Sequence, residues 1–295
     1  MKKLICLLFM MLVIGNLNAK EINNKKYNRI ISMSMAGDEI LFDLISRERI
    51  IAFSGHSSTN EMASVLNKKL DRYEKIDNNV EKIIDLEPDL VIAASWLKKE
   101  IAAQLEDANI NIYTYKTPTT FEEQKELIIE LSILLDVEEK GKEIVKDMDD
   151  RLIVIQNKIK KSGKAKPKIL EYSHTEGTNG KGSIFDDMLQ KIYGINLARE
   201  IGIGCFAKLS KEKVIEIDPD IILVPTWENF STEKRNDSRL LDFIKKDNSY
   251  KDLKAVKNNQ IYTIPGKYVY IYSQYVIEGI EDLAQTVYQF KEEEK

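Results

Sequence analysis

Two stretches of the chain carry nearly the same pattern of polar and apolar residues. The first, EKIIDLEPDLVIAASW, runs from Glu81 to Trp96, and the second, EKVIEIDPDIILVPTW, runs from Glu212 to Trp227. Aligned without a gap, they are identical at six of sixteen positions. Each predicts a short helix, a Pro-Asp turn and a strand, and the continuous apolar run of that strand is typical of burial on both faces of a parallel sheet.

Strands and helices are predicted to alternate around both copies of this unit. Before and after the first copy, the pattern predicts strands at 28–34, 49–54 and 109–115 and helices at 37–47 and 98–108. Around the second copy, it predicts strands at 166–173 and 259–265 and helices at 183–193, 238–247 and 274–290. Such alternation favours an α/β fold with parallel sheets. We therefore expect two Rossmann-like lobes, each with a central, mostly parallel sheet.

One long amphipathic helix is predicted between the lobes. Its apolar positions recur at spacings of three and four, namely Val137, Gly141, Ile144, Met148, Leu152, Ile155 and Ile159. A helix of this length measures roughly 38 Å. It could form a coiled-coil seam, but a single such segment favours a brace between the lobes. The predicted boundaries are a signal peptide at 1–19, an N-terminal lobe at 20–136, the interlobe helix at 137–163 and a C-terminal lobe at 164–295.

The first nineteen residues have the pattern of a secretory signal. Lys2 and Lys3 precede an apolar run, and Ala19 supplies a small residue for cleavage. The run is too short for a permanent membrane span, although an N-terminal anchor is the alternative. Cys6 lies too early to serve as a lipoprotein anchor, and Cys205 is then the one cysteine of the mature chain. We expect a free periplasmic protein without a lipid anchor or an intramolecular disulfide.

The composition excludes some classes of partner and gives little support to catalysis. The net charge is −4 with no basic patch, which argues against nucleic acid. No G-x-S-x-G elbow occurs. EGTNGKGS (176–183) is not a phosphate-binding Walker motif, because Thr175 stands before it where Gly is needed and Gly182 stands where Ser or Thr is needed. A two-lobe α/β enzyme, such as a glycosyltransferase, is therefore the least favoured class. We expect a monomeric binding protein, not an enzyme.

The two histidines follow predicted strands. His56 comes after the strand that ends at Ser54, and His174 comes after the strand that ends at Ser173. Open α/β sheets bind ligands at the carboxyl ends of their strands. Two histidines are few for a dedicated zinc or manganese site, so such a site remains an alternative. No resident metal or cofactor is expected.

Aromatic residues also gather at predicted strand ends, where they could grip a flat or multi-ring ligand. Trp96 and Trp227 end the two repeated strands. We predict that the ligand lies between the lobes, against Met33, Ser34, Ser54, His56, Trp96, Tyr172, His174, Trp227, Tyr268 and Tyr270.

These motifs together resemble a known family. RIISMSMAGDEILFDL, NNVEKIIDLEPDLVIA, GKGSIFDDMLQKIYGIN and LSKEKVIEIDPDIILV are similar to segments of the periplasmic substrate-binding proteins of ABC importers for iron-siderophore complexes, haem and cobalamin. The resemblance implies two α/β lobes joined by one long helix, with little closure on binding. It also implies that Glu81 and Glu212, which begin the two repeated helices, dock onto arginines of the membrane permease.

The resemblance defines the expected function. We expect the protein to capture an iron chelate, either a siderophore complex or haem, and to deliver it to an ABC permease dimer and its ATPase in the inner membrane. Cobalamin is the alternative ligand within the same family. The MSMAGDE loop lacks the Ser-Pro-Ser that is commoner in the family, so the ligand preference of relatives cannot be transferred.

Overall fold

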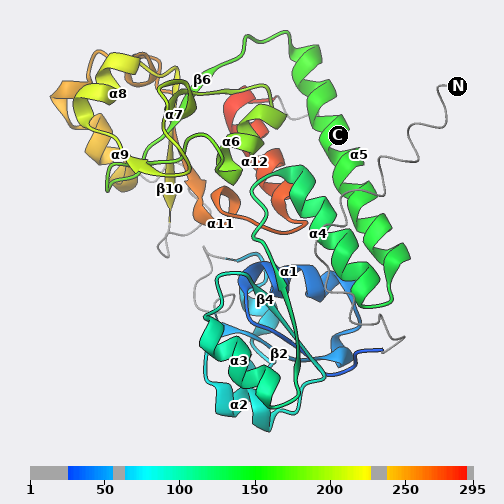
Figure 1. The fold of residues 1–295 in the computed structure, drawn as a ribbon. Coiled ribbons are helices and arrows are strands. Elements are labelled where there is room, and N and C mark those ends of the chain that lie inside the picture. The colour runs from blue at the N-terminus through cyan, green and yellow to red at the C-terminus, as the bar shows by residue number, and fades with distance from the viewer. Residues whose placement is uncertain (1–25, 56–63, 227–237, 291–295) are drawn as a thin grey trace, which may run out of the picture.

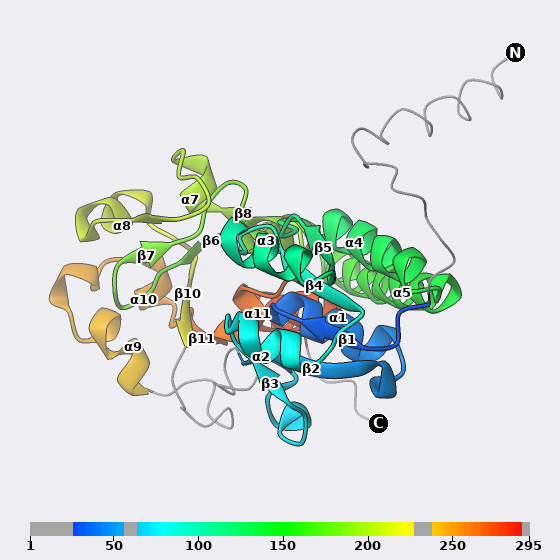
Figure 2. The ribbon, with the colours of Figure 1, turned by 60° about the horizontal axis from the view of Figure 1, so that its bottom comes forward.

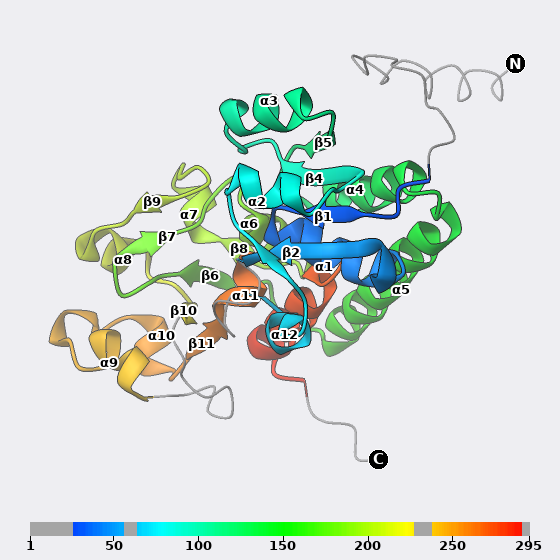
Figure 3. The same ribbon diagram turned by 90° about the horizontal axis from the view of Figure 1, so that it is seen from below.

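The fold consists of two α/β lobes and one long helix that runs beside both of them (Figure 1). The structure is a computed structural model, and it describes residues 26–55, 64–226 and 238–290. Figures 2 and 3 show helices α4 and α5 side by side along one flank of the molecule. The predicted architecture of two lobes joined by one helix is confirmed.

The N-terminal lobe is built on a parallel sheet of five strands. Its order is β3-β2-β1-β4-β5, so neighbours in space are not always neighbours in sequence. The strands are β1 (Ile30–Ser32), β2 (Ile50–Ser54), β3 (Lys75–Ile76), β4 (Leu90–Ala94) and β5 (Asn111–Tyr115). The helices are α1 (Met35–Leu44), α2 (Val80–Asp85), α3 (Lys99–Asp107) and α4 (Phe121–Leu134), with short 3₁₀ turns η1 (Arg47–Arg49) and η3 (Asn67–Leu70).

The C-terminal lobe repeats this plan with a parallel sheet of four strands, in the order β11-β10-β6-β8. The strands are β6 (Lys168–Glu171), β8 (Ile195–Asn196), β10 (Ile221–Thr226) and β11 (Ile261–Pro265), and β7 (Gly177–Thr178) and β9 (Ala207–Lys208) form a separate antiparallel pair. The helices are α6 (Ile184–Lys191), α7 (Leu197–Glu200), α8 (Lys211–Ile217), α9 (Ser238–Lys245), α10 (Lys254–Lys257), α11 (Gly266–Val269) and α12 (Val276–Tyr288), and η4 spans Asn248–Tyr250.

The repeated sequence unit forms equivalent structures in the two lobes, as α2–β4 and α8–β10. The side chain of Asn79 accepts from the backbone N–H of Lys82 to cap α2, and Ser210 accepts from that of Lys213 to cap α8. In both strands alternate side chains point into different cores. Ile92 of β4, for example, lies in one core and Val91 in another. This explains the unbroken apolar runs, because both faces of each sheet are covered.

Helix α5 (Glu138–Ser162) follows the predicted interlobe segment. It ends at Gly163, which takes a left-handed conformation with φ of 62°. Gly141 lets α4 approach closely, because a Cβ at this position would lie 2.4 Å from Oγ of Ser132. The two helices therefore pack as one brace.

The largest apolar core continues through the brace from one lobe to the other. Met148, Leu152 and Ile155 of α5 belong to the same cluster as Ile30 of the first sheet and Ile169 of the second. Arg151 of α5 also holds Glu281 of α12 by two hydrogen bonds of 2.9 and 2.6 Å. A core shared in this way ties the lobes together, because separating them would expose apolar surface.

No helix in the described part of the chain has the length and apolar content that a membrane crossing requires.

Candidate functional site

Three of the predicted contact residues of the N-terminal lobe are buried within that lobe. Ser34 caps α1 by accepting from the N–H of Gly37, and its hydroxyl lies 2.6 Å from the hydroxyl of Tyr115. Ser54 donates to the carboxylate of Asp38 from both its backbone N–H and its hydroxyl, at 3.0 and 2.6 Å. Met33 is buried in the core of the lobe. These side chains support the sheet edge and leave little surface for a ligand.

Trp96 is in a different position. It follows β4 at the carboxyl edge of the sheet and is 57% exposed. A bare indole at this edge offers a stacking surface. Two other predicted contact residues, His56 after β2 and Trp227 at the end of the second repeat, lie outside the described residues.

The predicted contact residues of the C-terminal lobe are spread over three environments. Tyr172 is buried in a core, beside the ring of Phe243, and its hydroxyl donates to the carbonyl of Leu209. His174 is exposed in the turn after β6. Tyr268 is half-buried on α11, whereas Tyr270 lines a pocket. The structure therefore gives Tyr172 a packing position that no ligand could reach without rearrangement.

The pocket beside Tyr270 has a volume of about 360 Å³, and we call it the aromatic pocket after the four aromatic rings among its lining residues. Its residues come from the segment before α4, the start of α6, the loop before β9, and α11 with the segment that follows it. They are Thr119, Asn179, Gly182, Ser183, Ile184, Phe185, Cys205, Phe206, Val269, Tyr270 and Tyr272. None of these lining residues is charged.

Phe206 is the most open ring of the aromatic pocket. It is 62% exposed, and its ring lies against Gly177, where a Cβ would come within 2.8 Å of it. Gly177 thus allows the ring to approach β7 closely. The ring is supported on one side and open on the other, which suits stacking on a flat ligand.

A buried carboxylate holds the polar side of the pocket in place. The Asn179 side chain donates to Glu171 at 2.8 Å and to the hydroxyl of Tyr270 at 2.7 Å. Burial raises the pKa of Glu171 to about 7, and burial together with this nearby carboxyl raises the pKa of Tyr270 above its ordinary value. Tyr270 is therefore a neutral phenol at physiological pH. It can stack and hydrogen-bond, but it is poorly prepared to bind metal as a phenolate.

The segment that lines the aromatic pocket also joins the two lobes. Immediately after Tyr272, Ser273 donates to Oε2 of Glu39 at 2.6 Å, and Gln274 donates to the backbone carbonyl of Glu39 at 2.7 Å. Tyr275 donates to Asp43 at 2.6 Å. Both acceptors lie on α1 of the N-terminal lobe. The pocket wall and the lobe junction are therefore consecutive parts of one segment of the chain.

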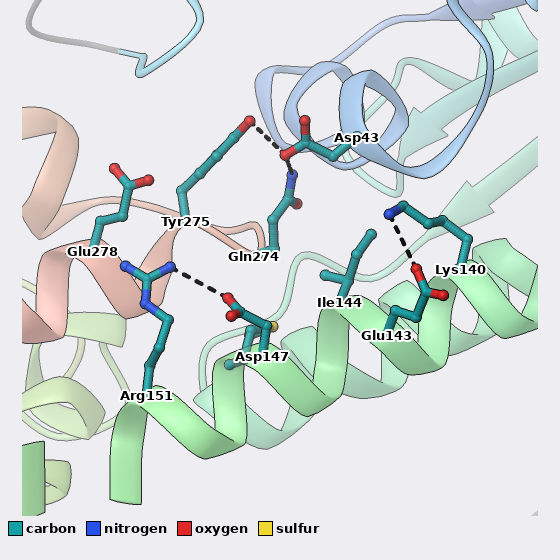
Figure 4. Close-up of a pocket in the computed structure, with 10 residues that line it drawn as sticks. Asp43, Lys140, Glu143, Ile144, Asp147, Arg151, Gln274, Tyr275 and Glu278 are labelled. Carbon is teal, nitrogen blue, oxygen red and sulfur yellow. Dashed lines mark hydrogen bonds and ion pairs between the residues drawn. The ribbon is translucent and has the colours of Figure 1, made fainter. Parts of the chain in front are cut away.

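A second cavity, the junction pocket, lies on the other side of these contacts, between α1, α5 and the start of α12 (Figure 4). Its volume is about 330 Å³. Figure 4 shows Gln274 and Tyr275 reaching Asp43 of the other lobe, and Arg151 paired with Asp147 one turn away on α5. Lys140 pairs with Glu143, Arg151 pairs with Asp147, and Asp43 accepts from Gln274 and Tyr275 of the other lobe, so we assign this pocket a role in holding the lobes together. Among the residues described, no three potential metal-ligating side chains converge.

The two glutamates of the repeat are exposed at equivalent positions. Glu81 lies in the first turn of α2 and Glu212 in the first turn of α8. Hydrogen bonds from the backbone N–H of Glu212 and from the hydroxyl of Ser210 hold the pKa of Glu212 below its ordinary value, so this carboxylate is ionised. A short turn joins each helix to the next strand, so each helix starts towards the edge where the strands end.

Sequence reasoning identified one residue of the aromatic pocket, Tyr270, and missed most of its wall. Gly182 and Ser183 belong to EGTNGKGS, which the sequence only distinguishes from a Walker motif, and Phe185 belongs to the helix predicted at 183–193. Phe206 stands in a loop without periodicity, and Tyr272 alternates with core residues. The sequence offered one indication of this wall, namely the aromatic residue Phe206 directly after Gly204-Cys205. A large apolar side chain in a loop can belong to a binding surface.

Comparisons with known proteins agree with this architecture. A sequence profile of the family described as "Periplasmic binding protein" matches residues 30–268. An ABC transporter substrate-binding lipoprotein of Bacillus subtilis is 27% identical over 271 residues, which cover 90% of this chain and 81% of the relative. The iron-uptake system-binding protein of the same organism is 24% identical over 72% of this chain and 66% of its own length. A crystal structure of a possible iron-binding, periplasmic solute-binding protein from Staphylococcus epidermidis is 27% identical, with a TM-score of 0.76, and the match covers 90% of this chain and 100% of that one.

The profile covers most of the chain, including both lobes and the helix between them. The first of these relatives is by name a substrate-binding protein of an ABC transporter, and the second is a binding protein of an iron-uptake system. The resemblance inferred from the sequence motifs is therefore confirmed, and the chain belongs to the periplasmic binding protein family.

Proposed function

We propose that the protein captures an iron chelate, a siderophore complex or haem, against the aromatic pocket and delivers it to an ABC permease. The observation that carries the proposal is the uncharged wall formed by Phe206, Tyr270 and Tyr272 beside the lobe junction. Flat aromatic groups of a chelate or macrocycle would stack on these rings, and the fixed hydroxyl of Tyr270 would orient them. The names of the Bacillus and Staphylococcus relatives support iron as the cargo.

The N-terminal lobe would supply the opposite wall. Trp96 is the open aromatic ring at its sheet edge. Since the lobes share one core, the ligand would enter a site that is already formed, with small adjustments of the segment 270–275. A pre-formed site limits the entropy lost on binding.

Delivery would depend on the glutamates of the repeat. Glu81 and Glu212 would each form a charge-assisted pair with an arginine of one permease subunit. One carboxylate on each lobe matches a permease of two subunits, with the ATPase on the cytoplasmic side. The protein would act as a monomer, because a second copy would compete for these faces.

Two measurements test the proposal. The first is the absorbance spectrum and native mass of protein purified from its own organism, since a ferric chelate, haem and a corrinoid have distinct signatures. A bound corrinoid, or a free metal ion with no chelator, would refute the iron-chelate assignment. The second is uptake in cells that carry Glu81→Arg and Glu212→Arg, which should abolish transport while ligand affinity remains at the wild-type value. Normal uptake by the double variant would refute docking through these residues.

Whether the mature protein is free or anchored by a lipid needs a separate test. The sequence favours a free form, whereas the B. subtilis relative is a lipoprotein. Intact mass spectrometry of the mature protein distinguishes cleavage after Ala19 from a lipid-modified N-terminus.

A further inference from the structure

The two repeated helices share a second feature besides their glutamates. Ile84 of α2 and Ile215 of α8 are 37% and 40% exposed, although the residue before each one, Ile83 and Val214, is fully buried. Consecutive helix positions are about 100° apart, so both isoleucines lie at the flank of the buried face with part of the side chain open to solvent. They occupy the same position of the aligned repeat.

Each exposed isoleucine lies between two carboxylates on one helix face. Residues at i, i+3 and i+4 share a face of a helix, which groups Glu81, Ile84 and Asp85 on α2. The same spacing groups Glu212, Ile215 and Glu216 on α8. We call these two sets the docking triads. All six residues are exposed.

The charges around each docking triad leave its leading glutamate available to a partner. Lys82 turns aside to Glu74 at 2.5 Å, and Lys213 turns to Glu216 at 2.6 Å. Within the described residues, neither Glu81 nor Glu212 forms a salt bridge. Glu212 accepts hydrogen bonds from its own backbone N–H and from Ser210, and no cation of the described residues neutralises either glutamate. A carboxylate without a salt bridge beside an exposed isoleucine fits a basic side chain that is flanked by apolar surface.

We propose that each docking triad is one contact unit for the ABC permease, with its isoleucine buried in an apolar recess beside the basic residue that receives the glutamate. This inference rests on the proposed transport function and adds two residues, Ile84 and Ile215, to the docking surface. The isoleucine excludes water from the ion pair, which strengthens the pair and adds apolar burial of its own. A partner whose basic residue is surrounded by polar, hydrated surface would bind less tightly than one whose basic residue lies beside an apolar recess.

The repetition distinguishes these positions from other exposed apolar side chains. Ile133 of α4 and Ile153 and Val154 of α5 are more exposed, but they lie on the brace and have no counterpart in the other lobe. A two-subunit permease with similar subunits presents the same chemistry twice. Matching triads on α2 and α8, which lie on different lobes in Figure 2, meet that requirement.

The test measures binding of the purified protein to its permease–ATPase complex in lipid nanodiscs. Ile84→Ser and Ile215→Ser should each weaken binding roughly 3–10-fold, and the double variant more than either, by the usual value of a partly buried aliphatic side chain. Ile153→Ser is the matched control, since it makes the same change on an exposed helix face and should bind like the wild type. Ile84 and Ile215 are partly covered, so their variants should melt somewhat lower, but all variants should stay folded at the temperature of the binding measurement.

Salt dependence separates the apolar contribution from the charges. At high salt the ion pairs are screened, so the wild type should retain a residual affinity that the double isoleucine variant loses. Wild-type binding by the double variant, with loss of binding in Glu81→Arg and Glu212→Arg, would overturn this inference and leave the proposed function standing. Failure of the wild-type protein to bind the complex would overturn both.

Discussion

Ser273 donates a hydrogen bond of 2.6 Å to Oε2 of Glu39 across the lobe junction, although the two residues are 234 positions apart in the chain. The other carboxylate oxygen of Glu39 accepts from Ser64 at 2.6 Å. Glu39 is almost fully buried, so its protonation state affects the junction between the lobes.

We predict that stability decreases as pH rises from about 4.5 to about 7, and that Glu39→Gln weakens this decrease. Burial raises the pKa of Glu39 from 4.5 to about 7, and the neighbouring Glu278 acts in the same direction. The folded protein therefore holds a proton that the unfolded chain has lost. This stabilisation is complete below about pH 4.5 and disappears as pH passes 7.

Glu39 alone should contribute roughly 2–3 kcal/mol to the change in the free energy of unfolding between pH 5 and pH 8, at about 1.4 kcal/mol per pKa unit. Glu171, whose pKa burial also raises to about 7, adds a decrease that Glu39→Gln leaves in place. Urea unfolding at both pH values measures it. Glu81→Gln, at an exposed position, should keep the wild-type dependence. An unchanged slope in Glu39→Gln would show that this carboxyl does not carry the extra proton.

We predict that Gly141→Ala destabilises the brace by about 1–3 kcal/mol, since overpacking forces the two helices apart. The added Cβ would lie 2.5 Å from Cβ of Ser132, which is too close for α4 and α5 to keep their positions. Gly204→Ala is the control, because a Cβ there meets nothing within 4 Å. Thermal unfolding compares the two variants, and equal melting temperatures would contradict close packing of the brace.

We predict that Phe206→Ala and Tyr270→Ala each weaken binding of the co-purified ligand by about 1–3 kcal/mol, as expected for aromatic anchors. Tyr268→Ala should retain the wild-type affinity, because Tyr268 does not line the aromatic pocket. Titration calorimetry with the ligand-free protein measures all three. A larger loss in Tyr268→Ala than in Tyr270→Ala would place the ligand elsewhere on α11.

Trp96→Ala tests the opposite wall separately. A loss of similar size would show that both lobes contact the ligand, as proposed from the exposed indole. Wild-type affinity would restrict the site to the C-terminal lobe.

We predict that ligand binding changes the relative orientation of the lobes by only a few degrees. The shared core and the contacts of Ser273, Gln274 and Tyr275 with α1 would all have to break for a wide hinge motion. Small-angle scattering with and without ligand should give nearly superimposable curves. A large compaction on binding would contradict the rigid brace.

The sequence by itself determined the architecture, because periodic patterns of apolar residues identify helices and strands without knowledge of their tertiary contacts. The apolar stripe from Val137 to Ile159 predicted α5, and the repeat at Glu81 and Glu212 predicted equivalent helix-turn-strand units. Both patterns follow from local rules of side-chain direction, with a period near 3.6 for helices and continuous apolar runs for buried strands. The same patterns placed both glutamates correctly at exposed helix starts.

Only the tertiary structure decided which side chains share a pocket. Tyr172 and Tyr270 both follow strands of the C-terminal lobe, yet one is buried in a core and the other is open to a cavity. Sequence position cannot separate them, because burial depends on which helices cover each face of the sheet. The same holds for Phe206 on Gly177 and for Ser273 on Glu39, since each pair forms by contact between segments that are distant in the chain.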